Sequence, residues 1–193
     1  MLTNINILKK IKKPTKLISK SKKNLFLIPY FFTYMNAVFG LISILRALEG
    51  DYFASGGYIL LAACMDAFDG RLARALGSSS YFGMELDSLC DAISFCLAPA
   101  VLLYSWHLGS IGFVGTAVLA FYLCAGLFRL ARFNCKGSEC VQTFTGLPTT
   151  AAAFFIASLV MFNIDVKNGF LFVFVVIISS LMVSSIGMPS FKK

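Results

Sequence analysis

The stretch from Ala92 to Phe128 decides the fold of this 193-residue chain and reads AISFCLAPAVLLYSWHLGSIGFVGTAVLAFYLCAGLF. It contains no Asp, Glu, Lys or Arg. As one helix it would be about 55 Å long, whereas a membrane-spanning helix needs only roughly 20 apolar residues. The segment Ser105–Ser110 divides it and places Trp106 at an interface, where aromatic side chains are enriched. The sequence therefore predicts two consecutive spans here.

The composition supports a membrane protein throughout. Hydrophobic residues make up 58% of the chain, charged residues only 13%, and the mean hydropathy is +0.80. A soluble domain usually carries charge on about a quarter of its residues. These values exclude a water-soluble globule and a disordered chain, and they exclude a nucleic-acid partner despite the net charge of +8. The six cysteines have no zinc-type spacing and are expected to act as small apolar residues.

We predict an all-α integral membrane protein with six transmembrane helices. All basic residues except Arg46 and Lys167 then fall on one side, so the positive-inside rule places both termini in the cytoplasm and the protein in the cell membrane. Residues 1–24 form a basic juxtamembrane segment, either an interfacial helix on anionic headgroups or a plain basic tail. Residues 25–193 form the membrane domain. Its predicted spans are 26–48, 53–74, 84–104, 111–132, 148–163 and 169–187.

The acidic residues are concentrated in one region, with five of the nine between positions 66 and 91. Asp66 and Asp69 share one face of a helix, and Asp87 and Asp91 share one face of the next. Four carboxylates facing one cavity repel each other unless cations neutralise them. With no His or Cys among them, oxygen ligands favour two divalent cations, Mg²⁺ or Mn²⁺. Glu85 lies off this face and is left out of the site.

Small residues and an arginine accompany the carboxylates. Gly70, Ala73 and Gly83 lie on the same helix faces and leave room for a ligand or for a close backbone approach. Arg74 is a bidentate donor suited to phosphate. Together with the metals, these residues describe a diphosphate site. The alternative is that the carboxylates only pair with arginines to stabilise the bundle, but two arginines nearby are too few for five acids.

The motif resembles a known signature. The pattern Asp-x2-Asp-Gly-x2-Ala-Arg-x8-Gly-x3-Asp-x3-Asp runs without departure from Asp66 to Asp91 and is similar to that of the CDP-alcohol phosphatidyltransferase family. The resemblance implies a six-span membrane enzyme, a homodimer, that transfers a phosphatidyl group from a CDP-lipid to an alcohol and releases CMP. It assigns metal binding to Asp66, Asp69, Asp87 and Asp91, and makes Asp91 the general base as well. Gly70, Arg74, Ser80 and Gly83 would bind the CDP moiety.

Two further segments resemble the members of the family that use L-serine as the acceptor. The first carries Pro29, Thr33 and Asn36, which would bind nucleotide or acceptor, or hydrogen-bond between helices; Tyr30 stands where an Asn is usual. The second carries Arg129 and Arg132, which would bind the serine carboxylate or anchor the span at the membrane surface. The resemblance therefore predicts transfer to serine, with CDP-lipid, serine and membrane lipids as partners.

Three alternatives stay open. The acceptor could be glycerol phosphate or inositol phosphate, which would need a richer basic pocket. The lipid donor could be ether-linked instead of CDP-diacylglycerol. A divalent-cation transporter, from another class, would need polar residues through several spans, and the last three predicted spans have almost none.

Overall fold

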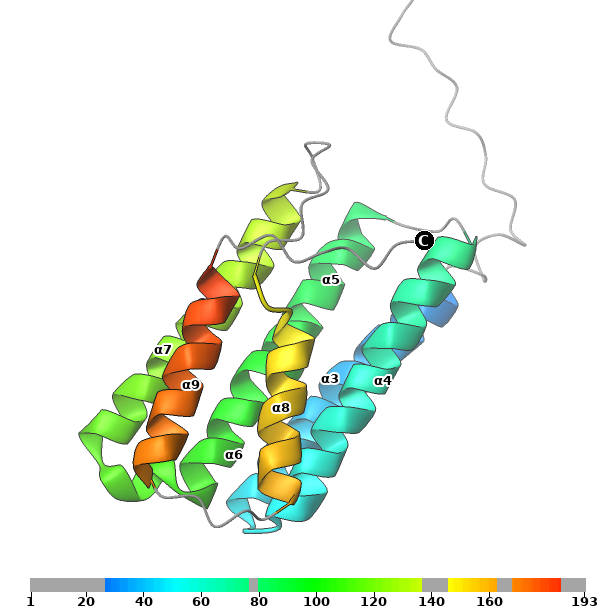
Figure 1. Cartoon of the computed structure of the whole chain (residues 1–193). Helices are drawn as coiled ribbons and strands as arrows, with labels where there is room; N and C mark the ends of the chain where they lie inside the picture. The colour runs from blue at the N-terminus through cyan, green and yellow to red at the C-terminus, as the bar shows by residue number, and fades with distance from the viewer. Residues whose placement is uncertain (1–26, 77–79, 137–145, 163–167, 185–193) are drawn as a thin grey trace, which may run out of the picture.

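A computed structural model describes residues 27–76, 80–136, 146–162 and 168–184 of the chain. This part is all-helical, and its helices form six rods that lie side by side (Figure 1). The basic segment 1–24 lies outside the described residues. The elements in order are α3 (Leu27–Leu48), α4 (Tyr52–Leu76), the continuous rod of α5 (Tyr81–Asp91), η1 (Ala92–Leu97) and α6 (Ala98–Trp106), the short turn η2 (Leu108–Ile111), α7 (Phe113–Lys136), α8 (Thr149–Met161) and α9 (Asn168–Val183).

The six predicted spans correspond to these six rods, but the rods differ in length and polarity. In the described part, the segments Tyr30–Leu48, Tyr81–Trp106 and Phe113–Cys135 are long and apolar enough to cross a membrane, whereas α8 and α9 are shorter apolar helices. α4 has 25 residues but is less apolar, because its second half carries the acidic motif. The prediction of the helices is confirmed, and three of them meet the requirements of a full span.

The predicted break in the long apolar stretch is present. α6 ends at Trp106, a 3₁₀ turn covers Leu108–Ile111, and α7 begins at Phe113. Gly112 has a φ of 68°, a left-handed conformation that glycine adopts without steric cost. The chain therefore reverses direction here, as the polar segment predicted.

The rod between Tyr81 and Trp106 contains a π-helix that the sequence did not predict. The N–H of Ala98 donates to the carbonyl of Ile93, one residue further back than in an α-helix. Pro99, at the start of α6, has no N–H and interrupts the series of backbone bonds. The carbonyl of Phe95, within the π-helix, accepts a hydrogen bond of 2.8 Å from the hydroxyl of fully buried Tyr122 on α7. A side chain of a neighbouring helix thus bonds to the backbone of this irregular turn, as in other membrane helices.

The packing leaves the outside of the bundle apolar. Buried side chains such as Leu102, Ile156 and Leu171 form the core between the rods, with α4 against α8 and α7 against α9. Many large apolar side chains point outward instead, and Phe113 is 88% exposed. An apolar exterior of this extent is what lipid tails would cover.

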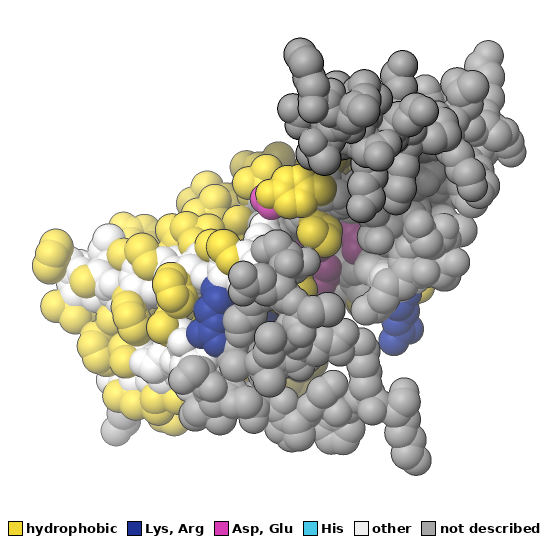
Figure 2. Space-filling model, turned by 90° about the horizontal axis from the view of Figure 1, so that it is seen from above, with side chains coloured by type: hydrophobic (Ala, Val, Ile, Leu, Met, Phe, Trp, Pro, Cys, Tyr) yellow, Lys and Arg dark blue, Asp and Glu magenta, His cyan; other side chains and the backbone are white. Residues whose placement is uncertain are grey.

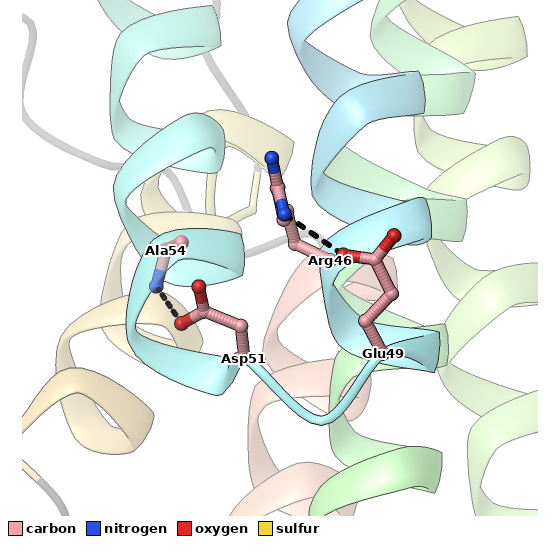
Figure 3. Close-up of polar contacts among 4 residues, drawn as sticks. All are labelled: Arg46, Glu49, Asp51 and Ala54. Atoms are coloured by element: carbon pink, nitrogen blue, oxygen red, sulfur yellow. Dashed lines mark hydrogen bonds and ion pairs between the residues drawn. The ribbon is translucent and has the colours of Figure 1, made fainter.

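The loop between α3 and α4 lies at the end opposite to the acidic motif and satisfies its own charges (Figure 3). Arg46 and Glu49 form an ion pair at 2.8 Å. Asp51 accepts a hydrogen bond from the backbone N–H of Ala54 at 3.0 Å and caps the start of α4. These acids lie outside the motif from Asp66 to Asp91, and their contacts are local.

Candidate active site

Three carboxylates from two helices meet. Asp66 and Asp69 come from α4 and Asp87 from α5, and each offers an oxygen such that the three oxygens lie within 4.8 Å of one another. Seen from above, acidic side chains are visible at the upper end of the bundle among apolar ones (Figure 2). Three of the four aspartates that the spacing indicated therefore lie together.

Two threonines from other helices hold the carboxylates of α4. The hydroxyl of Thr33, on α3, donates to Asp69 Oδ2 at 2.8 Å. The hydroxyl of Thr150, on α8, donates to Asp66 Oδ2 at 3.5 Å. Thr33 was among the predicted site residues, whereas Thr150 was missed; its only signal is a hydroxyl within the first turn of a span that follows Pro148. Both bonds fix a carboxylate oxygen without supplying positive charge.

Asp91 lies one helical turn beyond Asp87 and outside the group of three. Asn36, which is fully buried on α3, donates its Nδ2 to Asp91 Oδ1 at 2.9 Å. The hydroxyl of Ser94 donates to the backbone carbonyl of Asn36, also at 2.9 Å. Ser94 belongs to the π-helix, and a Cβ on Gly40 would lie 2.4 Å from its hydroxyl oxygen. The close approach of α3 to the π-helix thus places Asn36 against Asp91.

The donor set fits a divalent metal ion. Within the described residues, no ion pair involves any of the four aspartates. Among these residues, Asp87 Oδ1 is buried and has no hydrogen-bond partner. A buried, unpaired carboxylate oxygen is costly unless a cation compensates it. Asp66, Asp69 and Asp87 could hold a hard cation such as Mg²⁺ or Mn²⁺, which prefers oxygen ligands.

The glycines of the motif differ in their surroundings. A Cβ on Gly70 would meet nothing within 4 Å, so this position beside Asp69 is open. A Cβ on Gly83 would lie 3.1 Å from Tyr30 Cε1 and 3.2 Å from Ser80 Oγ. The small residues were expected either to leave room for a ligand or to permit a close approach of helices. Gly70 leaves room, whereas Gly83 permits the close approach of α3 to α5.

The two arginines predicted for the acceptor both lie on α7. Arg129 interacts electrostatically with Asp91, and among the described residues its buried Nε has no hydrogen-bond partner. Arg132 donates to the backbone carbonyl of Val183, at the end of α9, with a distance of 3.4 Å. Arg129 therefore keeps a buried donor near the acidic site.

Glu85 faces α7, away from the other acids. Its Oε2 accepts a hydrogen bond from Asn134 Nδ2 at 3.2 Å, and Asn134 Oδ1 accepts one from the hydroxyl of Ser88 at 2.9 Å. These contacts tie α5 to α7 beside the site. Two predicted residues cannot be placed in this way: Pro29 and Arg74 belong to α3 and α4, but their side chains lie outside the described part.

Comparison with known proteins identifies the class to which this fold and acidic site belong. Residues 26–185 match the CDP-alcohol phosphatidyltransferase family, and the chain is a member of it. Two relatives named CDP-diacylglycerol–serine O-phosphatidyltransferase are similar: that of Helicobacter pylori is 35% identical over 178 residues (88% of this chain, 74% of the relative), and that of Bacillus subtilis is 34% identical over 166 residues (86% and 92%). An archaetidylserine synthase of Methanothermobacter thermautotrophicus is 35% identical over 166 residues (84% and 69%).

The family membership and the apolar helices together identify the chain as a CDP-alcohol phosphatidyltransferase and an integral membrane protein. The resemblance found in the acidic motif is thereby confirmed.

Proposed function

We propose that the protein transfers the phosphatidyl group of a CDP-lipid to the hydroxyl of L-serine, giving phosphatidylserine and CMP. The observation that carries this proposal is the meeting of Asp66, Asp69 and Asp87 within 4.8 Å, with Asp91 one turn away. The relatives are named CDP-diacylglycerol–serine O-phosphatidyltransferase and archaetidylserine synthase, and these names support serine as the acceptor. They leave both ester-linked and ether-linked CDP-lipids open as donors.

Asp66, Asp69, Asp87 and Asp91 would hold two divalent cations. When bound, these ions neutralise the diphosphate and stabilise the charge that develops on the CMP leaving group. The hydroxyls of Thr33 and Thr150 orient the carboxylates of α4 for this role. Gly70, with open space beside it, would let the CDP moiety approach the backbone of α4 together with Ser80 and Arg74.

Asp91 would act as the general base. Its Oδ1 is held by Asn36, which leaves Oδ2 to accept the proton of the serine hydroxyl. The serine oxygen forms a bond to the phosphorus that carries the lipid, and the bond from that phosphorus to the oxygen of CMP breaks. Arg129, whose buried Nε has no hydrogen-bond partner in the described part of the chain, would bind the serine carboxylate. Arg132, also on α7, would support this pocket through its hydrogen bond to Val183 at the end of α9.

The topology belongs to the same proposal. Arg71 and Arg132 lie toward the end of the bundle that carries the carboxylates, and the positive-inside rule would place this end at the cytoplasmic face of the cell membrane. All six rods of the domain 25–193 would then span, with both termini in the cytoplasm, the segment 1–24 on the membrane surface and a homodimer as the assembly. Alkaline phosphatase fused to either terminus should be inactive in intact cells, because it needs the outer compartment.

A reaction assay tests the proposed function. Purified protein receives Mn²⁺, a CDP-lipid of either linkage and one alcohol from a panel of L-serine, glycerol phosphate and inositol phosphate, and CMP release is measured. Of the three alcohols, only L-serine is expected to give CMP release. Release only with a phosphorylated alcohol would contradict the choice of serine, and no release with any alcohol would favour the transporter alternative.

A further inference from the structure

Tyr30 stands where an Asn is usual in the segment that the resemblance describes, so the resemblance leaves it without a role. Its hydroxyl forms a hydrogen bond of 2.8 Å with Ser80 Oγ, fifty positions away. Its ring lies over Gly83 and packs edge-on against Phe82, with ring centroids 6.1 Å apart. One side chain of α3 thus contacts the cap and the first turn of α5.

Ser80 is the residue through which this contact reaches the site. It is the N-cap of α5, and its Oγ accepts a hydrogen bond from the backbone N–H of Gly83 at 3.0 Å. A hydroxyl has one donor and two acceptor positions, so one acceptor is already used. In the hydrogen bond between Ser80 and Tyr30, one of the two hydroxyls is the donor and the other is the acceptor. One O–H of the pair is therefore left to donate to another group, and anionic oxygens are favoured at the start of a helix.

We propose that Tyr30 is a positioning residue for substrate binding, which holds Ser80 so that one hydroxyl of the pair can donate to the phosphate oxygens of the CDP moiety. The inference rests on the proposed function, because the contact of Ser80 with CDP is part of it. It goes beyond that function in giving Tyr30 of α3 a part in nucleotide binding. Asp66, Asp69 and Asp87 take no part in it.

The test is a double-mutant cycle on CDP-lipid kinetics. Tyr30→Phe keeps the ring over Gly83 and removes only the hydroxyl, and should raise the KM for CDP-diacylglycerol about three- to tenfold while kcat stays within about twofold. Ser80→Ala should do the same or more. The double variant should be no worse than Ser80→Ala, because the two hydroxyls act as one unit. Additive losses would overturn the proposal, as would an unchanged KM in Tyr30→Phe.

Two further variants separate positioning from folding. Tyr34→Phe changes the next turn of α3, where the tyrosine is 52% exposed, and should leave KM and kcat unchanged. Gly83→Ala introduces a Cβ 3.1 Å from the Tyr30 ring and should raise the KM as Tyr30→Phe does. A lower unfolding temperature in Tyr30→Phe with an unchanged KM would show a structural role only, and would overturn the proposal.

Binding of CDP alone, measured by calorimetry in detergent with Mn²⁺, distinguishes failure of this inference from failure of the proposed function. If the wild type binds CDP yet releases no CMP with L-serine, the proposed function fails. The inference is then decided by affinity: CDP binding about three- to tenfold weaker in Tyr30→Phe supports it, and equal binding overturns it.

Discussion

The two ends of the bundle use carboxylates in opposite ways. At the end shown in Figure 3, Glu49 pairs with Arg46, and Asp51 caps α4 by accepting from the N–H of Ala54. At the other end, three aspartates lie together, and in the described residues no cation pairs with them. Exposed acids beside their own partners need nothing from outside the chain. Acids that are buried or half-buried, and that receive at most neutral hydrogen bonds, favour an external cation, which is the physical mark of a site.

The strongest test of this contrast removes the proposed base. Asp91→Asn preserves the size of the side chain but cannot accept the serine proton, and CMP release should fall about 10²- to 10⁴-fold. CDP-lipid binding should persist, because Asp66, Asp69 and Asp87 remain. Asp51→Asn at the opposite end is the matched control and should keep full activity. Turnover near that of the wild type in Asp91→Asn would contradict the assignment of the base.

Asp87 and Glu85, both on α5, should differ in their effect on the metal requirement of the enzyme. Asp87→Asn removes a carboxylate of the group of three, and the Mn²⁺ concentration for half-maximal activity should rise at least about tenfold, since even outer groups of metal sites have effects of that size. Glu85→Gln, two residues away and bonded to Asn134, should leave that concentration unchanged. Chelation should abolish activity reversibly in the wild type. Equal metal requirements in the two variants would contradict the assignment of Asp87.

Two open glycines on α4 give a sharper contrast within one helix. Neither Gly70, near the carboxylates, nor Gly57, in the other half, would have an atom within 4 Å of an added Cβ. Alanine is the better helix former, so neither change should lower the unfolding temperature. Gly70→Ala should nevertheless raise the KM for the CDP-lipid about tenfold by filling substrate space, an order-of-magnitude expectation for a steric change at a ligand contact. Gly57→Ala should leave this KM unchanged. Equal KM values in the two variants would exclude substrate contact at Gly70.

The hydrogen bond that orients Asp69 should have a smaller effect. Thr33→Val keeps the shape of the side chain and removes the hydroxyl that donates to Asp69, so activity should fall roughly three- to tenfold at limiting Mn²⁺. Higher Mn²⁺ should restore part of it. Thr116→Val, which removes a hydroxyl bonded to the backbone carbonyl of Gly112, should have no such effect. A loss that Mn²⁺ cannot change would assign Thr33 another role.

The smallest effect is expected at the opposite end. Glu49→Gln removes an exposed ion pair, and such pairs contribute about 0–1 kcal/mol. Thermal unfolding in detergent should shift little, and CMP release should stay at the wild-type rate. A large loss of activity would show that the two ends are coupled and would break the contrast drawn between them.

The sequence was sufficient to predict the helices and the central acids, because both follow from local patterns. Apolar runs and the break at Ser105–Ser110 define the rods, and regular spacing places Asp66 with Asp69 on one face. Asp66 and Asp69 meet Asp87 because α4 and α5 both pack against α3. The placement of Asp66 with Asp69 needs only the periodicity of one helix, whereas their meeting with Asp87 also depends on α3.

The contacts between distant helices could not be predicted. Thr150 joins the site from α8, 84 positions after Asp66, and nothing in its local sequence indicates that contact. Tyr30 reaches Ser80 because Gly83 lets α3 come close, which depends on three-dimensional packing. Arg132 donates to the backbone carbonyl of Val183, 51 positions away on α9, and this contact likewise depends on three-dimensional packing.

The π-helix at Ala92–Leu97 sets the phase between the two halves of its rod. One additional residue in a turn rotates everything that follows by about 100° relative to a continuous α-helix. The polar stripe of Asp87 and Asp91 is thereby followed by buried Phe95 and the apolar core. The rod is consequently sensitive to this turn: if it became α-helical with no residue removed, α6 would turn away from its neighbours while the acids kept their place.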